Sequence, residues 1–144
     1  MREKLLWFIL KFLGISFVLF IFWWWKIQGF YLLFFESFVQ FLGVDSGIPQ
    51  SSVWIFSNLI PFASLMIITR GFKINERLKK LGWGILILII WHFISILIFF
   101  YSTGVRLEPV RIIFYTLYFL SVALPFFLWL VFFRKKLKGL FALG

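Results

Sequence analysis

The chain has 144 residues, 63% of them hydrophobic and only 14% charged. A water-soluble domain of this size could not bury so much apolar surface, so the composition predicts an all-α integral membrane protein with a single transmembrane domain. Cysteine is absent, which excludes disulfides, thiolate metal ligands and cysteine nucleophiles. One His and five acids leave little for a metal site, and we expect no cofactor.

The formal net charge is +10. In a soluble protein this excess would suggest nucleic acid as a partner. Here the basic residues stand beside hydrophobic runs, where cations set the membrane topology and contact anionic lipid headgroups. We therefore expect lipid, and not nucleic acid, to face these charges.

The first hydrophobic run, residues 5–25, reads LLWFILKFLGISFVLFIFWWW and has the roughly 20 residues that a helix needs to cross a bilayer core. It ends in tryptophans and Lys26 and not in a small-residue cleavage site, so we interpret it as a span and not as a signal peptide. Lys11, about two turns into the run, is expected to extend its side chain to the near interface.

The next segment, residues 29–43, reads GFYLLFFESFVQFLG and is too short and too interrupted for a span. Glu36, Ser37 and Gln40 share one helical face, and apolar residues cover the rest. This pattern predicts an amphipathic helix that lies in the interface or packs as a re-entrant piece.

Three further runs have spanning length, at residues 51–69, 81–101 and 111–133. Pro61 and Pro125 lie inside the first and the last of these, and Pro61 should kink its helix because proline donates no backbone hydrogen bond. Gly82 and Gly84 open the middle run and would allow close helix contact. The sequence thus predicts four spans plus one interfacial or re-entrant helix.

Four spans place both termini on one side, and that side holds all but three of the 15 Lys and Arg residues. The positive-inside rule then predicts a multi-pass protein of the cell (plasma) membrane, with both termini and the basic loop at 70–80 in the cytoplasm. The cations expected to contact lipid headgroups or a cytoplasmic partner are Arg70, Lys73, Arg77, Lys79, Lys80, Arg134, Lys135 and Lys136.

Two polar residues lie within the predicted spans, Asn58 in the outer half of 51–69 and His92 near the middle of 81–101. They could form a polar pocket or a proton path, because polar groups at membrane depth are costly. The alternative is hydrogen bonding between helices, worth roughly 0.6–2 kcal/mol each. We favour this alternative for both, and less strongly for His92, because an imidazole can titrate near physiological pH.

The stretch Phe35–Tyr101 resembles the exosortase/archaeosortase family of membrane transpeptidases in the order of its segments: an amphipathic piece (FESFVQFLGV), a span, a basic loop and a span (KINERLKKLGWGILILII). The family's chemistry uses a Cys, an Arg and a His. At those places this chain reads NLIP near Asn58, HFIS with Ser95 in place of the Arg, and Arg111 in place of the His. The resemblance therefore implies a degenerate, non-catalytic relative that kept the scaffold.

No nucleophile stands beside a plausible base, no glycine-rich phosphate loop appears and no carboxylate pair lies within a span, so we predict no catalytic residue. The candidate polar pocket consists of Asn58, His92, Ser95 and Arg111. Our leading hypothesis is a non-enzymatic subunit or accessory of a larger membrane complex, with other membrane-protein subunits as partners. The alternatives are an exosortase-like scaffold that binds a sorting-signal transmembrane helix, and a small transporter or channel subunit.

Overall fold

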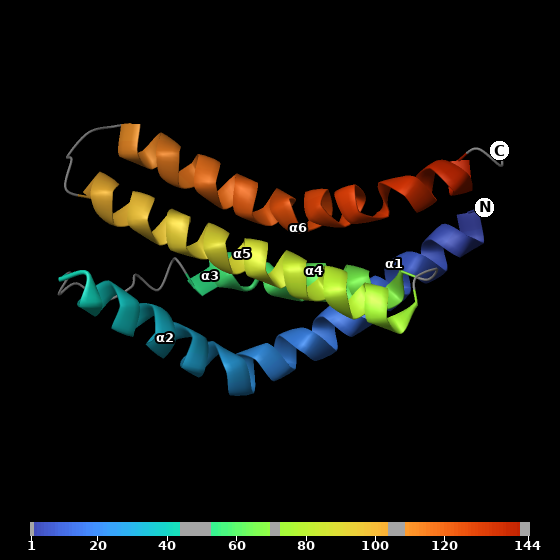
Figure 1. The fold of residues 1–144 in the computed structure, drawn as a ribbon, viewed down its shortest axis with the longest axis horizontal. Helices are drawn as coiled ribbons and strands as arrows, with labels where there is room; N and C mark the ends of the chain where they lie inside the picture. Colours follow the sequence, from blue (N-terminus) through green and yellow to red (C-terminus); the bar gives the residue numbers. More distant parts are fainter. Residues whose placement is uncertain (1, 44–52, 70–72, 104–108, 142–144) are drawn as a thin grey trace.

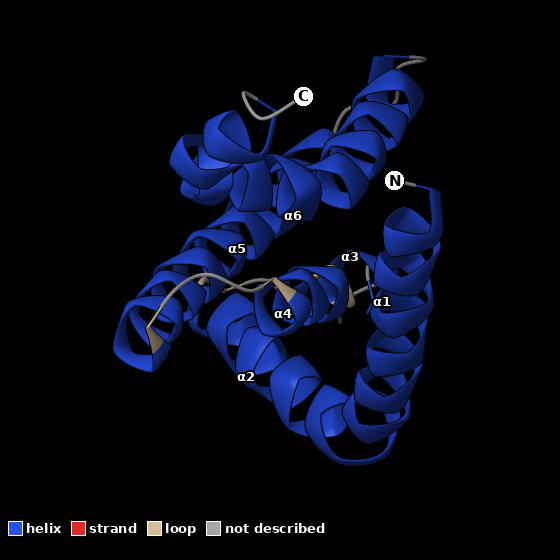
Figure 2. Ribbon diagram, turned by 90° about the vertical axis from the view of Figure 1, so that its right-hand side faces the viewer, coloured by secondary structure: helices blue, strands red, loops and turns tan. Residues whose placement is uncertain are grey.

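The computed structural model describes residues 2–43, 53–69, 73–103 and 109–141, and these are nearly all helical. In chain order the elements are α1 (Arg2–Phe22), the π-helical turn η1 (Trp23–Ile27), α2 (Gln28–Phe41), α3 (Val53–Phe56), α4 (Leu59–Ile68), α5 (Ile74–Thr103) and α6 (Pro109–Phe141). Helices α5 and α6 lie side by side, α1 and α2 form the two arms of a V, and α3 and α4 lie between these layers (Figures 1 and 2).

Among the described residues, three helical segments are long and apolar enough to cross a membrane: Leu6–Phe41, Ile74–Phe100 and Tyr115–Arg134. The all-α, multi-pass architecture expected from the sequence is thereby supported. The N-terminal end of α1, the C-terminal end of α4 and the C-terminal end of α6 lie at the same end of the molecule (Figure 1). The sidedness of these ends relative to a membrane stays a prediction.

The first run and the expected interfacial helix form one continuous helical segment. At η1 the backbone N–H of Gln28 donates to the carbonyl of Trp23, which inserts an extra residue into the turn without breaking the helix. A straight 36-residue helix would extend about 54 Å, well beyond a core of about 30 Å. The chain instead bends at η1 (Figure 1). The position of α2 relative to the bilayer interface stays a prediction.

The expected span at 51–69 is interrupted, and Pro61 explains where. Proline has no N–H with which to bond the carbonyl of Ser57 four residues earlier. The N–H of Ile60 donates to that carbonyl instead, at 3.0 Å, and Asn58 N–H donates to Ile55 O at 3.3 Å. These tighter bonds turn the chain at Ser57–Asn58, one turn before the proline, and divide the segment into α3 and α4.

Helices α4 and α5 are in close contact at Gly84. A Cβ atom at this position would overlap the Phe62 ring, a side chain with no exposed surface. The close contact predicted for small residues at the start of α5 is therefore found at Gly84, whereas a Cβ on Gly82 would meet nothing within 4 Å.

We predict that Gly84→Ala lowers the free energy of unfolding by about 1–3 kcal/mol, because the added methyl overpacks the contact with Phe62. Gly82→Ala is the matched control in the same helix and should leave stability unchanged or slightly raised. Thermal unfolding in detergent would measure both. Phe62→Leu should restore part of the loss in the Gly84→Ala background, and equal stability of the two alanine variants would contradict the packing described.

Candidate functional site: a buried hydrogen-bond network

A backbone carbonyl in the middle of α6 anchors the network. Pro125 lies inside α6 and cannot donate to the carbonyl of Ser121, its partner four residues earlier in a regular helix. The side-chain amide of Asn58 donates to this oxygen at 3.1 Å. Asn58 is the residue at the break before α4, and it makes no side-chain cap to its own helix. The break caused by Pro61 thus places the Asn58 amide where it can bond the Ser121 carbonyl, which Pro125 leaves without a helical donor.

The other end of the Asn58 amide faces His92. Asn58 Oδ1 lies 2.9 Å from His92 Nε2, and the Tyr31 hydroxyl lies 2.6 Å from His92 Nδ1. Because the Asn58 nitrogen already faces a carbonyl, its oxygen must accept, so His92 donates from Nε2. Nδ1 then accepts from the Tyr31 hydroxyl. One neutral tautomer of the imidazole satisfies every bond in the chain.

Four segments meet in this network: Tyr31 belongs to α2, Asn58 to the α3–α4 break, His92 to α5 and Ser121 to α6. A further bond runs between α5 and α6, where Trp91 Nε1 donates to the Ser121 hydroxyl at 2.7 Å. His92 has no exposed surface, and Asn58 is 6% exposed. The polar groups that the sequence placed in the membrane are therefore buried in the protein and paired with one another.

Aromatic rings enclose the imidazole. The ring centroids of Phe56 and Tyr31 lie 5.1 and 5.8 Å from that of His92, and Phe35 stacks on Phe56 at 5.0 Å. A hydroxyl, an imidazole and an amide in a row resemble the order nucleophile, base and orienting group. Yet neither Tyr31 nor His92 lines the cavity beside the network. The described contacts of Tyr31, His92 and Asn58 fit hydrogen bonding between helices.

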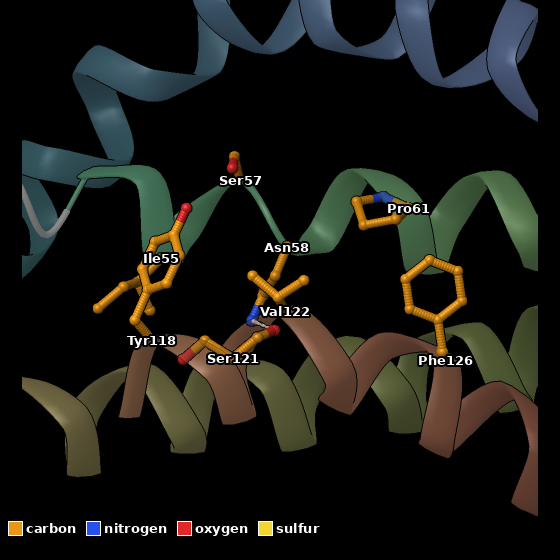
Figure 3. Close-up of a pocket in the computed structure, with 8 residues that line it drawn as sticks. All are labelled: Ile55, Ser57, Asn58, Pro61, Tyr118, Ser121, Val122 and Phe126. Carbon is orange, nitrogen blue, oxygen red and sulfur yellow. Dashed lines mark hydrogen bonds between the residues drawn. The ribbon is translucent and has the colours of Figure 1, made fainter. Parts of the chain in front are cut away.

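A cavity of about 140 Å³ lies on the other side of Asn58, between α3–α4 and α6 (Figure 3). In Figure 3, Asn58 points down to the Ser121 carbonyl, Tyr118 and Phe126 rise from α6 on either side, and Ser57 lies on the face turned away from α6. The residues lining the cavity are Ile55, Ser57, Asn58, Pro61, Tyr118, Ser121, Val122 and Phe126.

The predicted pocket residues are only partly brought together. Asn58 and His92 share a hydrogen bond, as the hypothesis of bonding between helices requires. Ser95 lies one turn beyond His92, 3% exposed, and its hydroxyl has no hydrogen-bond partner in the described part of the chain. Arg111 is in the first turn of α6, about 15 Å along the helix from Ser121, and its side chain lies outside the described residues.

Two of the predicted headgroup-contacting cations bind the protein's own backbone. Lys80 Nζ donates to Phe132 O at 2.9 Å, and an Arg77 guanidinium nitrogen donates to Ile67 O, near the C-terminus of α4, at 3.3 Å. The Ile67 carbonyl lies in the last turn of α4, where carbonyls lack helical partners and a cation is favourable. Lys73, Lys79 and Arg134 are exposed, whereas Arg70 and the side chains of Lys135 and Lys136 lie outside the described residues. Among the described residues, no cluster of His, Asp or Glu could hold a metal ion.

Sequence reasoning missed Tyr31, Trp91 and Ser121. Ser121 carried a readable signal, because a proline inside a span frees the carbonyl four residues before it and that carbonyl needs a donor in lipid. Tyr31 carried none, since nothing in its local pattern shows that the bend at η1 brings its hydroxyl to His92.

No family model, no curated protein and no solved structure matches this chain. The exosortase resemblance therefore stays a hypothesis carried by segment order.

We predict that Asn58→Ala lowers the free energy of unfolding by about 1–3 kcal/mol, because it leaves His92 Nε2 and the Ser121 carbonyl without partners. Ser95→Ala, which removes an unpaired buried hydroxyl from the next turn of α5, should stay within about 0.5 kcal/mol of the parent.

The origin of the bond is tested by a double-mutant cycle with Pro125→Ala. Alanine restores an N–H that can reach the Ser121 carbonyl, so Asn58→Ala should cost less in this background, with a coupling of about 0.5–2 kcal/mol. Strictly additive effects would show that the proline does not create the need for Asn58.

Proposed function

We propose that this protein is a non-enzymatic integral membrane subunit or accessory of a larger membrane complex. The observation that carries the proposal is that the polar groups at membrane depth bond to one another. His92 and Asn58, the candidate residues for chemistry, form hydrogen bonds that hold α2, α4, α5 and α6 together. Within the part of the chain that the structure describes, no group of three or more His, Asp or Glu side chains could hold a metal ion.

The surface of the V supports the same proposal. Only 6% of the spanning window in Leu6–Phe41 is buried, against 28% and 22% for the windows in α5 and α6. Gly14 lies in this poorly covered segment, and a Cβ there would meet nothing within 4 Å. Small residues on open faces of membrane helices suit packing against a second helix. The V therefore has surface to offer a partner subunit.

We further propose four crossings with both termini in the cytoplasm, α3 and α4 together forming the second. Because the chain has no native cysteine, single introduced cysteines report on sidedness without background. Lys73→Cys, at the exposed start of α5, should react with a membrane-impermeant maleimide only after permeabilisation of cells. Leu42→Cys, at the end of α2, should react in intact cells. The opposite pattern would reverse the topology, and protection of Leu42→Cys under both conditions would place the end of α2 inside the bilayer.

The complex itself is tested by purification. Tagged protein extracted from native membranes in a mild detergent should retain one or more partners at fixed stoichiometry, measured by native mass spectrometry. Extraction in a harsh detergent is the control, and it should release the 17.3 kDa chain alone. A lone monomer under the mild condition, with no partner captured by crosslinking in intact membranes, would contradict the proposal.

A second candidate, an exosortase-like scaffold that binds a sorting-signal helix, is favoured by one observation. Asn58 and His92, which stand near the family's reactive motifs, lie 2.9 Å apart across two helices. In that case Arg111→Ala should weaken capture of a tagged sorting-signal helix as strongly as Asn58→Ala does. Capture that is insensitive to both changes would remove this candidate.

A further inference from the structure

The cavity beside Asn58 opens where the layers of the fold separate. Near the C-terminal half of α6, α1 packs against it through two ring contacts, Phe8 with Trp129 at 6.3 Å and Phe12 with Phe126 at 6.1 Å. Beyond these contacts the chain turns at η1, and α2 packs instead against Phe93 of α5. Figure 2 shows the same divergence, with α1 and α2 on different sides of α4.

The first half of α6 is therefore left with a broad exposed face. Tyr118 is 43% exposed, Phe119 71% and Val122 51%. Tyr118 and Val122 also line the cavity, so the cavity opens onto this face. In a spanning helix such a face meets hydrocarbon or another helix.

The cavity presents hydrogen-bond donors that the described residues do not use. A side-chain amide has two N–H groups, and Asn58 uses one of them on the Ser121 carbonyl. The Tyr118 hydroxyl forms no hydrogen bond within the described part of the chain. An occupant that brings an acceptor oxygen would find a donor on either side chain.

Depth and size decide what kind of occupant this is. Ser121 lies well inside the span Tyr115–Arg134, where phospholipids supply only hydrocarbon and no acceptor. A helix of a second protein can supply an acceptor at this depth. A cavity of about 140 Å³ is close to the size that admits one benzene-sized group, so it takes one side chain and not a helix backbone.

We propose that the cavity is the docking site for a transmembrane helix of a partner subunit, which inserts one amide side chain from its central turn between Asn58 and Tyr118. The rest of that helix lies on the exposed face of α6 at Phe119 and Val122. This site rests on the proposed function as a complex subunit, and it gives the partner a chemical signature: an apolar helix with a single Asn or Gln at its midpoint.

The test uses two synthetic leucine–alanine transmembrane peptides of the same length, one with a single central Asn and one with Leu at that position. The full chain, labelled at Leu42→Cys, and the labelled peptides are placed in phosphatidylcholine vesicles, and energy transfer measures their association. We expect the Asn peptide to associate about five- to tenfold more strongly than its Leu counterpart.

Matched variants locate the site. Tyr118→Phe removes only the cavity hydroxyl and should reduce the preference for the Asn peptide, whereas Tyr115→Phe removes the same atom outside the cavity lining and should not. Val122→Phe fills the cavity mouth and should abolish the preference, whereas Leu120→Phe adds the same bulk at an exposed position that does not line it. Equal unfolding temperatures confirm that all four variants fold.

Equal association of the two peptides, or a preference that survives Val122→Phe, would overturn the docking site. Energy transfer between two labelled copies of the protein without peptide, abolished by Val122→Phe, would overturn it as well, because a second copy would then occupy the cavity. Either result leaves the proposed function standing if partners still co-purify. A preference for the Asn peptide without co-purifying partners would support the docking site and contradict the proposed function.

Discussion

A carbonyl oxygen without a helical donor, deep inside a membrane span, is the constraint around which the structure is arranged. Pro125 leaves the Ser121 carbonyl in this state, and hydrocarbon offers no replacement donor. The amide of Asn58 supplies the missing bond. It can do so because Pro61 turns the chain at Ser57–Asn58 and leaves Asn58 free of its own helix. The carbonyl that Pro125 leaves unbonded in α6 is thus bonded by an amide that the break before α4 makes available.

The same bond determines the order of the neighbouring contacts. Once Asn58 donates to α6, its oxygen must accept from His92, and His92 must accept from Tyr31. Each step adds a helix, so α2, α4, α5 and α6 are held in register by groups that have no alternative partner in lipid. The opposite end of the bundle has a second set of polar ties: Trp129 Nε1 donates to the Thr69 hydroxyl at 2.8 Å, and Lys80 bonds a carbonyl of α6.

This arrangement bears directly on function. A titratable group at membrane depth suggests proton transfer or catalysis when it faces a cavity or water. His92 faces Tyr31, Asn58 and aromatic rings, and the cavity begins only beyond Asn58. The proposed role therefore rests on the surfaces that the bundle leaves open and not on its one imidazole. The face of α6 beside the cavity combines unused donors with exposed apolar area, which is the chemistry that a partner helix can complement.

The sequence by itself determined the membrane environment, the helical class, most helix positions and the burial of Asn58 and His92, because hydropathy, helix length and the cost of polar groups in lipid are local properties. It also indicated that Pro61 would disturb its helix. Only the three-dimensional structure decided that residues 23–41 continue the first helix, that the Pro61 break opens Asn58 toward α6, and that Tyr31 completes the network. The positions of Asn58 and Tyr31 depend on contacts between residues 61 to 63 apart in the chain, which no local pattern encodes.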